Sequence, residues 1–124
     1  MYDRSLVTEI LEQIIEAIET VQERCTFAKS QDDFIDIKEG QEKLDGICMK
    51  LIAVGESLKK IDTITERKLL AKYPEIEWRK IKGIRDFISH HYFDLDADVI
   101  FSICQDHIGN LLKTLKIILQ DIQR

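Results

Sequence analysis

One short stretch in the second half of the chain combines residue types that can cleave a phosphodiester. Residues 85–92 read RDFISHHY, so four residues separate Arg85 from His90 and one separates His90 from Tyr92. A histidine titrates near neutral pH and can take the proton from a ribose 2′-hydroxyl or give one to the leaving oxygen. An arginine can hold the scissile phosphate with paired donors and stabilise its developing charge. This chemistry needs the 2′-hydroxyl, so the expected substrate is RNA and not DNA.

The spacing of these residues sets a geometric condition on the site. On an ideal helix Arg85 and His90 point about 140° apart, so they cannot face one phosphate from a straight helix. We therefore expect that the helix distorts or ends near Ser89, or that a second subunit completes the site. Tyr92 follows Arg85 by seven residues and returns to its face if the helix continues.

The neighbouring polar residues have simpler explanations beside the chemical one. Arg85 could pair with a carboxylate on a nearby helix, and Asp86 could orient His90 as its i, i+4 partner. We expect His91 to be structural, close to the apolar stripe of its helix, and His107 to be a packed or interface histidine. A metal site built from the histidines lacks supporting Cys or carboxylate spacing, so we expect no metal and no cofactor.

The composition and apolar spacing predict long helices that position this motif. The 124 residues include one proline and five glycines, which favours helices joined by short turns in a single domain spanning 1–124. Apolar residues at helical spacing predict an amphipathic helix over about residues 3–27. A second apolar stripe runs from Ile37 to Leu58, and Ser30, Asp32 and Asp33 supply capping side chains for its helix.

Local signals predict the remaining elements. Residues 63–66 (TITE) fit a capping box that opens a short helix ending near Tyr73. Pro74 is suited to begin the next helix, which runs through the motif. Three aspartates at positions 94, 96 and 98 mark the start of a last helix whose wide apolar face can pack on two sides. The predicted fold is all-α, an up-and-down bundle of four main helices plus one short helix.

The charge and the cysteines give further expectations. The net charge is −5, yet residues 59–85 hold 9 Lys/Arg against 4 Asp/Glu, which is either a local site for a polyanion or a solvated helix surface. Cys25, Cys48 and Cys104 are odd in number and lie in apolar helical patterns, so we expect buried free thiols. No segment is long and apolar enough for a membrane span or a signal peptide, which favours a cytoplasmic protein.

The motif and its setting resemble a known superfamily. Arg, four residues, His, one residue and Tyr resemble the HEPN signature, and the trailing tyrosine is typical of its HepT-like toxin branch. The lead-in PEIEW at residues 74–78 and the Asp-rich start of the last helix are similar to that branch as well. The resemblance is clearest over residues 74–108.

The resemblance implies a function and partners. It implies a HEPN-like bundle that forms a homodimer, with two motifs facing a shared cleft, and a metal-independent ribonuclease toxin of a type II toxin–antitoxin pair. Arg85 and His90 are then catalytic, with Asp86 and Tyr92 in support. The implied partner is a nucleotidyltransferase antitoxin that can adenylylate Tyr92, so that the added AMP blocks the cleft.

Two other classes of function stay open at this point. In one, the chain is a non-catalytic HEPN module that helps a nucleotidyltransferase to bind substrate or nucleotide, so Arg85 grips phosphate and His90 transfers no proton. In the other, the chain is a plain helical interaction domain and the motif is coincidental. Because binding alone does not require His90, the combined motif favours the enzyme.

Overall fold

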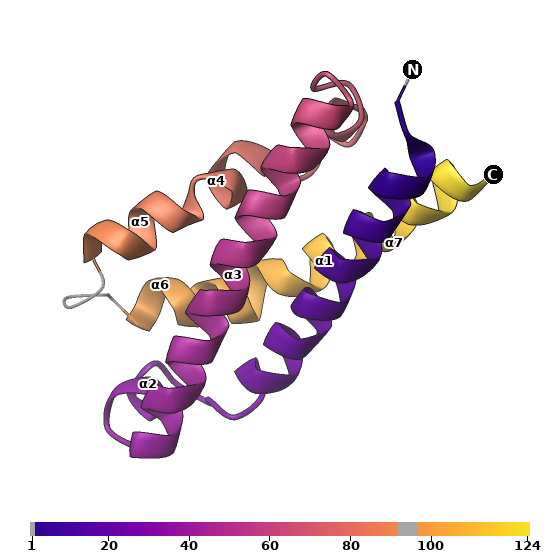
Figure 1. The fold of residues 1–124 in the computed structure, drawn as a ribbon. Helices are drawn as coiled ribbons and strands as arrows, with labels where there is room; N and C mark the ends of the chain where they lie inside the picture. The colour runs from indigo at the N-terminus through magenta and orange to yellow at the C-terminus, as the bar shows by residue number, and fades with distance from the viewer. Residues whose placement is uncertain (1, 92–96) are drawn as a thin grey trace.

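A computed structural model describes residues 2–91 and 97–124, and within these residues every regular element is a helix. Two long helices, α1 (Arg4–Cys25) and α3 (Lys38–Ile64), lie side by side (Figure 1). The C-terminal helix α7 (Ile108–Gln123) packs against α1. A short arm, formed by α4 (Trp78–Lys82) and α5 (Ile84–His91), packs against α3. The predicted all-α, HEPN-like class is confirmed for these residues, and none of their helices has the length and apolarity to cross a membrane.

Helix α1 confirms the first predicted helix. Asp3 caps its N-terminus, and its carboxylate accepts a hydrogen bond of 3.0 Å from the backbone N–H of Leu6. The buried face consists of residues three or four apart: Val7, Ile10, Leu11, Ile14, Ile15, Ile18, Val21 and Cys25. This spacing forms one continuous apolar stripe, which α3 and α7 cover.

The predicted cap of the second long helix is wrong. Residues Asp32–Ile35 form a separate turn, α2, and the Asp33 carboxylate accepts from the backbone N–H of Lys29 at 2.8 Å instead of capping α3. Ile37 has extended backbone angles, and α3 begins after it. The separation has a packing reason, because Gly40 lies so close to the backbone of Asp33 that a Cβ atom would overlap it.

The capping box predicted at residues 63–66 is also wrong. Helix α3 runs to Ile64, and Thr65 is its C-cap, with a hydroxyl that donates to the Ile61 carbonyl at 2.8 Å. Glu66 and Arg67 then take left-handed φ values of 55° and 62°. The same polar residues therefore end a helix here. The predicted short helix is a 3₁₀ turn, η1 (Leu70–Lys72), and it ends before Tyr73 as expected.

Pro74 does not begin a helix, contrary to the prediction. Helix α4 starts only at Trp78, with Glu77 as its N-cap. The indole N–H of Trp78 donates to the carbonyl of Tyr73 at 2.9 Å, which closes the intervening residues into a turn. The Tyr73 hydroxyl donates to the Asp121 carboxylate of α7 at 2.6 Å, so this turn joins the arm to the C-terminal helix.

The last predicted helix is divided into three parts. It comprises α6 (Ala97–Ser102), a π-helical turn (Ile103–His107) and α7. Asp98 lies in the first turn of α6, as predicted, whereas Asp94 and Asp96 lie outside the described residues. Cys104 in the π-helical turn is bonded to Cys25, at a Cα–Cα distance of 5.7 Å. The prediction of three free thiols is therefore wrong for this pair.

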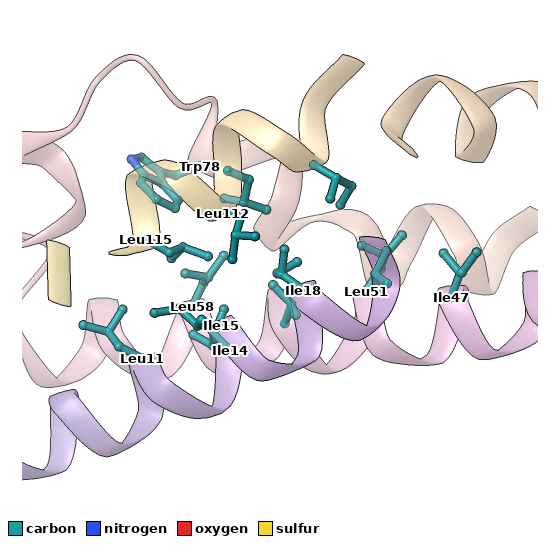
Figure 2. Packing of buried hydrophobic residues seen from close by; sticks show 14 of the residues in the cluster. Leu11, Ile14, Ile15, Ile18, Ile47, Leu51, Leu58, Trp78, Leu112 and Leu115 are labelled. Carbon is teal, nitrogen blue, oxygen red and sulfur yellow. The ribbon is translucent and has the colours of Figure 1, made fainter. Parts of the chain in front are cut away.

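The third cysteine agrees with the sequence-based interpretation. Cys48 is buried and free, and burial, followed by the nearby Asp45 carboxylate, raises the pKa of its thiol to about 11. Trp78 packs into the core, and only 8% of it is exposed. Figure 2 shows how α1, α3 and α7 contribute to this core, with Leu112 and Leu115 next to Trp78 and with Ile14, Ile18 and Leu58 in the layer beneath them. Each fully buried Leu or Ile contributes about 1.5–3 kcal/mol, so the core fixes the base of the arm.

Candidate functional site

Helix α5 carries Arg85, Asp86 and His90 without interruption. It continues to His91, so the predicted distortion or ending near Ser89 is absent from this helix. The angular separation of Arg85 and His90 therefore stays close to the ideal value of about 140°. Within one copy of the chain, the two side chains leave α5 on different sides. The spacing in the sequence left two alternatives, a helix that distorts or ends near Ser89 and a second subunit. Because α5 is unbroken, the second subunit is the alternative that remains.

A close backbone approach places the arm against α3. A Cβ atom at Gly55 would lie 2.7 Å from the Ile81 carbonyl oxygen and 3.3 Å from Cγ2 of Ile84. Glycine inside a helix costs about 1 kcal/mol relative to alanine, and here its lack of a side chain admits the arm. A partly buried ion pair between Lys82 and Asp62 joins the same two elements. The start of α5 is thus held at a defined distance from α3.

Arg85 lies on the α3 side of the arm and holds a carboxylate. Its Nη1 atom lies 3.1 Å from Oε1 of Glu56, and the other carboxylate oxygen of Glu56 lies 2.8 Å from Nζ of Lys59. The hydrogen bond from Lys59, and after it the one from Arg85, hold the pKa of Glu56 below its usual range. Arg85 therefore pairs with a neighbouring carboxylate in the free chain. That carboxylate marks a position where the guanidinium can hold an anionic oxygen.

Nothing in the sequence pointed to Glu56. It lies 29 residues before Arg85 on a different helix. The only local signals are the i, i+3 spacing to Lys59 and the adjacent Gly55, and both are ordinary helix features.

His90 is exposed, and its own helix fixes its tautomer. The Nδ1 atom lies 2.7 Å from the backbone carbonyl oxygen of Asp86. A carbonyl oxygen can only accept, so Nδ1 carries the proton and the lone pair of the neutral ring is on Nε2. Asp86 was expected to orient His90 with its side chain, and its backbone carbonyl makes the contact instead.

Neither of the two remaining histidines is packed in the core, and an interface role for His107 stays a prediction. His91 is exposed, and its ring centroid lies 5.1 Å from that of Phe87, so it is not part of the apolar stripe. His107 is exposed as well, at the end of the π-helical turn, and not packed within the bundle. Tyr92 lies outside the described residues. Among the described residues, no three His, Cys, Asp or Glu side chains are grouped to hold a metal ion.

An open groove of about 570 Å³ separates the arm from the C-terminal segment. Its apolar lining includes Ile81, Ile84, Phe87, Val99 and Ile103, and its polar lining includes Arg79, Lys80, His107 and Asn110. Phe87 and Val99 are each 37% exposed. Phe87 precedes His90 by three residues and lies beside it on α5. The groove therefore reaches α5 at Ile84 and Phe87, whereas Arg85 meets α3.

Comparison with known proteins identifies the family. The family model described as Ribonuclease HepT-like matches residues 10–118. The chain belongs to the HepT-like ribonuclease family. This membership confirms the enzyme class expected from the motif, while the roles of Arg85, His90, Asp86 and Tyr92 stay predictions.

Individual relatives of this HepT-like chain carry similar descriptions. A protein of Methanocaldococcus jannaschii described as a putative RNase is 27% identical over 120 residues, which cover 97% of this chain and 89% of that protein. A probable ribonuclease HepT of Thermococcus cleftensis is 32% identical over 103 residues, 83% of this chain and 86% of that protein. A gamma-glutamylcyclotransferase and putative RNase of M. jannaschii is 25% identical over 114 residues; they cover 92% of this chain and 48% of that protein. No solved structure matches the chain.

The basic segment of this HepT-like chain is partly neutralised by its own carboxylates. Besides the pairs already described for Lys59, Lys82 and Arg85, Lys68 lies 3.4 Å from Glu66 and Lys80 lies 3.1 Å from Glu77. Exposed pairs of this kind contribute only about 0–1 kcal/mol each. At Lys68 and Lys80 a phosphate can therefore replace the carboxylate at small cost.

Proposed function

We propose that this HepT-like chain is a metal-independent endoribonuclease in which His90 moves the proton and Arg85 holds the phosphate. The observation that carries the proposal is the hydrogen bond from Nδ1 of His90 to its own helix. That bond leaves Nε2, on an exposed ring, as the proton acceptor. The carboxylate held by Arg85 supports the second role, since a phosphate oxygen can take the same kind of hydrogen bond.

The proposed reaction involves only the RNA, His90, Arg85 and solvent. Nε2 of His90 takes the proton of the ribose 2′-hydroxyl, and the 2′-oxygen attacks the neighbouring phosphorus. The bond from phosphorus to the 5′-oxygen breaks, that oxygen takes up a proton from solvent, and Nε2 of His90 then returns its proton to solvent. The products are a 2′,3′-cyclic phosphate and a 5′-hydroxyl. Arg85 stabilises the charge that develops on the non-bridging oxygens, and DNA, which lacks the nucleophile, is left intact.

We propose that the active form is a homodimer. Because Arg85 and His90 diverge on an unbroken α5, one phosphate can meet both residue types only if a second copy supplies one of them. Phe87, which precedes His90 by one helical turn, and Val99, which lines the same groove as Phe87, support this arrangement, since both are exposed apolar side chains that a second copy can cover.

A cleavage assay in EDTA tests the catalytic roles. Arg85→Ala and His90→Ala proteins of confirmed fold are expected to lose about 100-fold or more of the parent's activity on RNA. His91→Ala is the matched control, because it removes a neighbouring exposed imidazole, and it should stay close to the parent. Cleavage that survives in His90→Ala would contradict the proton-transfer role.

Mixing of subunits tests the shared site. If each site takes Arg85 from one copy and His90 from the other, a mixed dimer of Arg85→Ala and His90→Ala chains contains one intact site. Random exchange of subunits should then restore about a quarter of the parental activity. Failure to restore any activity in a confirmed mixed dimer would show that this pairing across the interface is wrong.

We also propose that the chain is the toxin of a type II pair and that a nucleotidyltransferase antitoxin adenylylates Tyr92. Membership of the HepT-like family supports this role, as does the place of Tyr92 two residues after His90. The added AMP would bring bulk and negative charge to the motif. Co-expression followed by mass spectrometry should show one added AMP on the parent and none on Tyr92→Phe; a modified Tyr92→Phe chain would contradict the assignment.

The runner-up function is a non-catalytic module that helps a nucleotidyltransferase to bind substrate or nucleotide. The observation in its favour is that Arg85 holds an anionic oxygen without help from His90. A folded, unmodified dimer that leaves varied RNAs intact, yet binds a nucleotide through Arg85, would select this function.

A further inference from the structure

One ion pair joins the motif helix to the middle of α3. Nη1 of Arg85 and Oε1 of Glu56 are 3.1 Å apart, although the residues are separated by 29 positions in the chain. From this contact we propose that Glu56 is a positioning residue, which holds the Arg85 guanidinium in the orientation that receives the scissile phosphate. The inference rests on the ribonuclease function proposed above.

The carboxylate is suited to this role because its own position is fixed by backbone packing. Glu56 follows Gly55, where the Ile81 carbonyl oxygen lies in the space that a side chain would occupy. The buried face of α3 includes Val54, Gly55 and Leu58, on either side of Glu56 in the chain. The Lys82–Asp62 pair joins α4 to α3 two turns further on. Glu56 thus offers Arg85 a carboxylate on a rigid helix, at a set distance from α5.

A second cation keeps the carboxylate from neutralising the site. Nζ of Lys59 lies 2.8 Å from the other oxygen of Glu56, so one carboxylate lies between two cations. The lowered pKa of Glu56 keeps this group ionised at neutral pH. The cluster of Glu56, Lys59 and Arg85 therefore carries a net charge of about +1 before RNA binds.

Arg85 can keep this contact while it binds substrate. A guanidinium has five N–H donors in a fixed plane, and the contact with Glu56 is made through Nη1. The other edge of the plane can make a paired contact with a phosphate. Without Glu56, the long Arg85 side chain, of which 58% is exposed, would sample many orientations.

These features predict which kinetic constant changes. Glu56→Gln removes the negative charge but keeps the side-chain size, so the site becomes more positive and RNA binding is retained or tightened. The neutral amide holds the guanidinium more weakly than the carboxylate does, and loss of alignment of this kind lowers kcat by about 10- to 100-fold. A merely structural role would change the thermal midpoint and leave kcat of the folded protein unaltered.

The test measures kcat and KM for RNA cleavage by the full chain, with Arg85→Ala in the same series. Glu56→Gln should lower kcat with KM unchanged or lower, and Glu56→Asp, which restores the charge, should recover part of the loss. Glu66→Gln is the matched control, because it removes a carboxylate that is paired with Lys68 and distant from Arg85 in the chain; it should stay within about twofold of the parent.

Separate outcomes overturn this inference and the proposed function. If Arg85→Ala abolishes cleavage while Glu56→Gln matches Glu66→Gln, the positioning role is wrong and the ribonuclease function stands. A rise in kcat for Glu56→Gln would show that the carboxylate obstructs the site, and a rise in KM alone would show a binding role; either result overturns the inference. An inert parent, or full cleavage by Arg85→Ala, overturns both proposals.

Discussion

The Cys25–Cys104 bond joins the end of α1 to the π-helical turn before α7, and its removal tests how the C-terminal helix is held. The two cysteines are 79 residues apart in the chain, so the bond closes a long loop in the unfolded state. For a loop of this length the chain-entropy relation gives about 4.5 kcal/mol, and measured losses for native disulfides of small domains are about 2–5 kcal/mol. We therefore expect reduction to lower the free energy of unfolding by about 4 kcal/mol.

Urea denaturation with and without a dithiol reductant measures this loss. With a slope of about 2 kcal/mol per M urea, the midpoint should fall by about 2 M on reduction. Thiol titration in urea provides the count: the three cysteines of the chain should give one thiol before reduction and three after it. In the folded protein Cys48 should react slowly, because burial raises the pKa of its thiol to about 11 and little thiolate is present.

Two variants separate the bond from other effects of the reductant. Cys25→Ala with Cys104→Ala should unfold at the lower midpoint under both conditions. Cys48→Ala should keep the full response to reductant, because its change leaves the bond intact. A midpoint of the parent that does not respond to reduction, or three reactive thiols in unreduced, unfolded protein, would refute the reasoning.

Further predictions concern the arm and its attachment. Gly55→Ala should destabilise the protein by about 1–3 kcal/mol, because its Cβ would lie 2.7 Å from a backbone oxygen. A Cβ at Gly109 would meet nothing within 4 Å, so Gly109→Ala should be neutral or stabilising. The urea midpoints of the two variants test this difference. Tyr73→Phe should cost about 1 kcal/mol through the lost hydrogen bond to Asp121, and an unchanged midpoint would contradict that contact. Burial, and then Asp121, raises the pKa of Tyr73 from 10.0 to about 12. The stability linked to the protonated hydroxyl is therefore full below pH 10 and is lost as the pH rises through 12. The parent should show this loss of stability, and Tyr73→Phe should not.

The sequence predicted the long helices well because their apolar residues repeat at a helical period. The buried stripes of α1 and α7 follow that period closely, and their bounds agree with the expected ones to within a few residues, apart from the start of the last helix. Local capping signals were less reliable. The polar residues at 63–66 end a helix instead of starting one, and Pro74 precedes a turn closed by the Trp78 indole. In both cases a side-chain hydrogen bond to a nearby backbone carbonyl decides how the local signal is used.

The disulfide and the Glu56 contact depend on distances that residue spacing does not contain. Cys25, Cys48 and Cys104 all lie on apolar helical faces, and only the packing of α1 against the C-terminal segment brings two of them together. Likewise, Glu56 resembles many exposed glutamates until Gly55 brings the arm against α3. Sequence periodicity shows which face of a helix is buried, whereas these pairs depend on which helices meet.

The two sides of α5 are the reason why we propose that a second copy completes the motif. Its Arg85 side meets α3 and holds Glu56, whereas Phe87, one turn before His90, lines the open groove. An unbroken helix cannot turn these two sides toward one phosphate. A two-fold axis between copies exchanges equivalent surfaces, so it can set the Arg85 side of one α5 against the His90 side of the other. In such a pair Glu56 would keep each guanidinium aligned with the His90 of the other copy, because the His90 of its own copy points to a different side of α5.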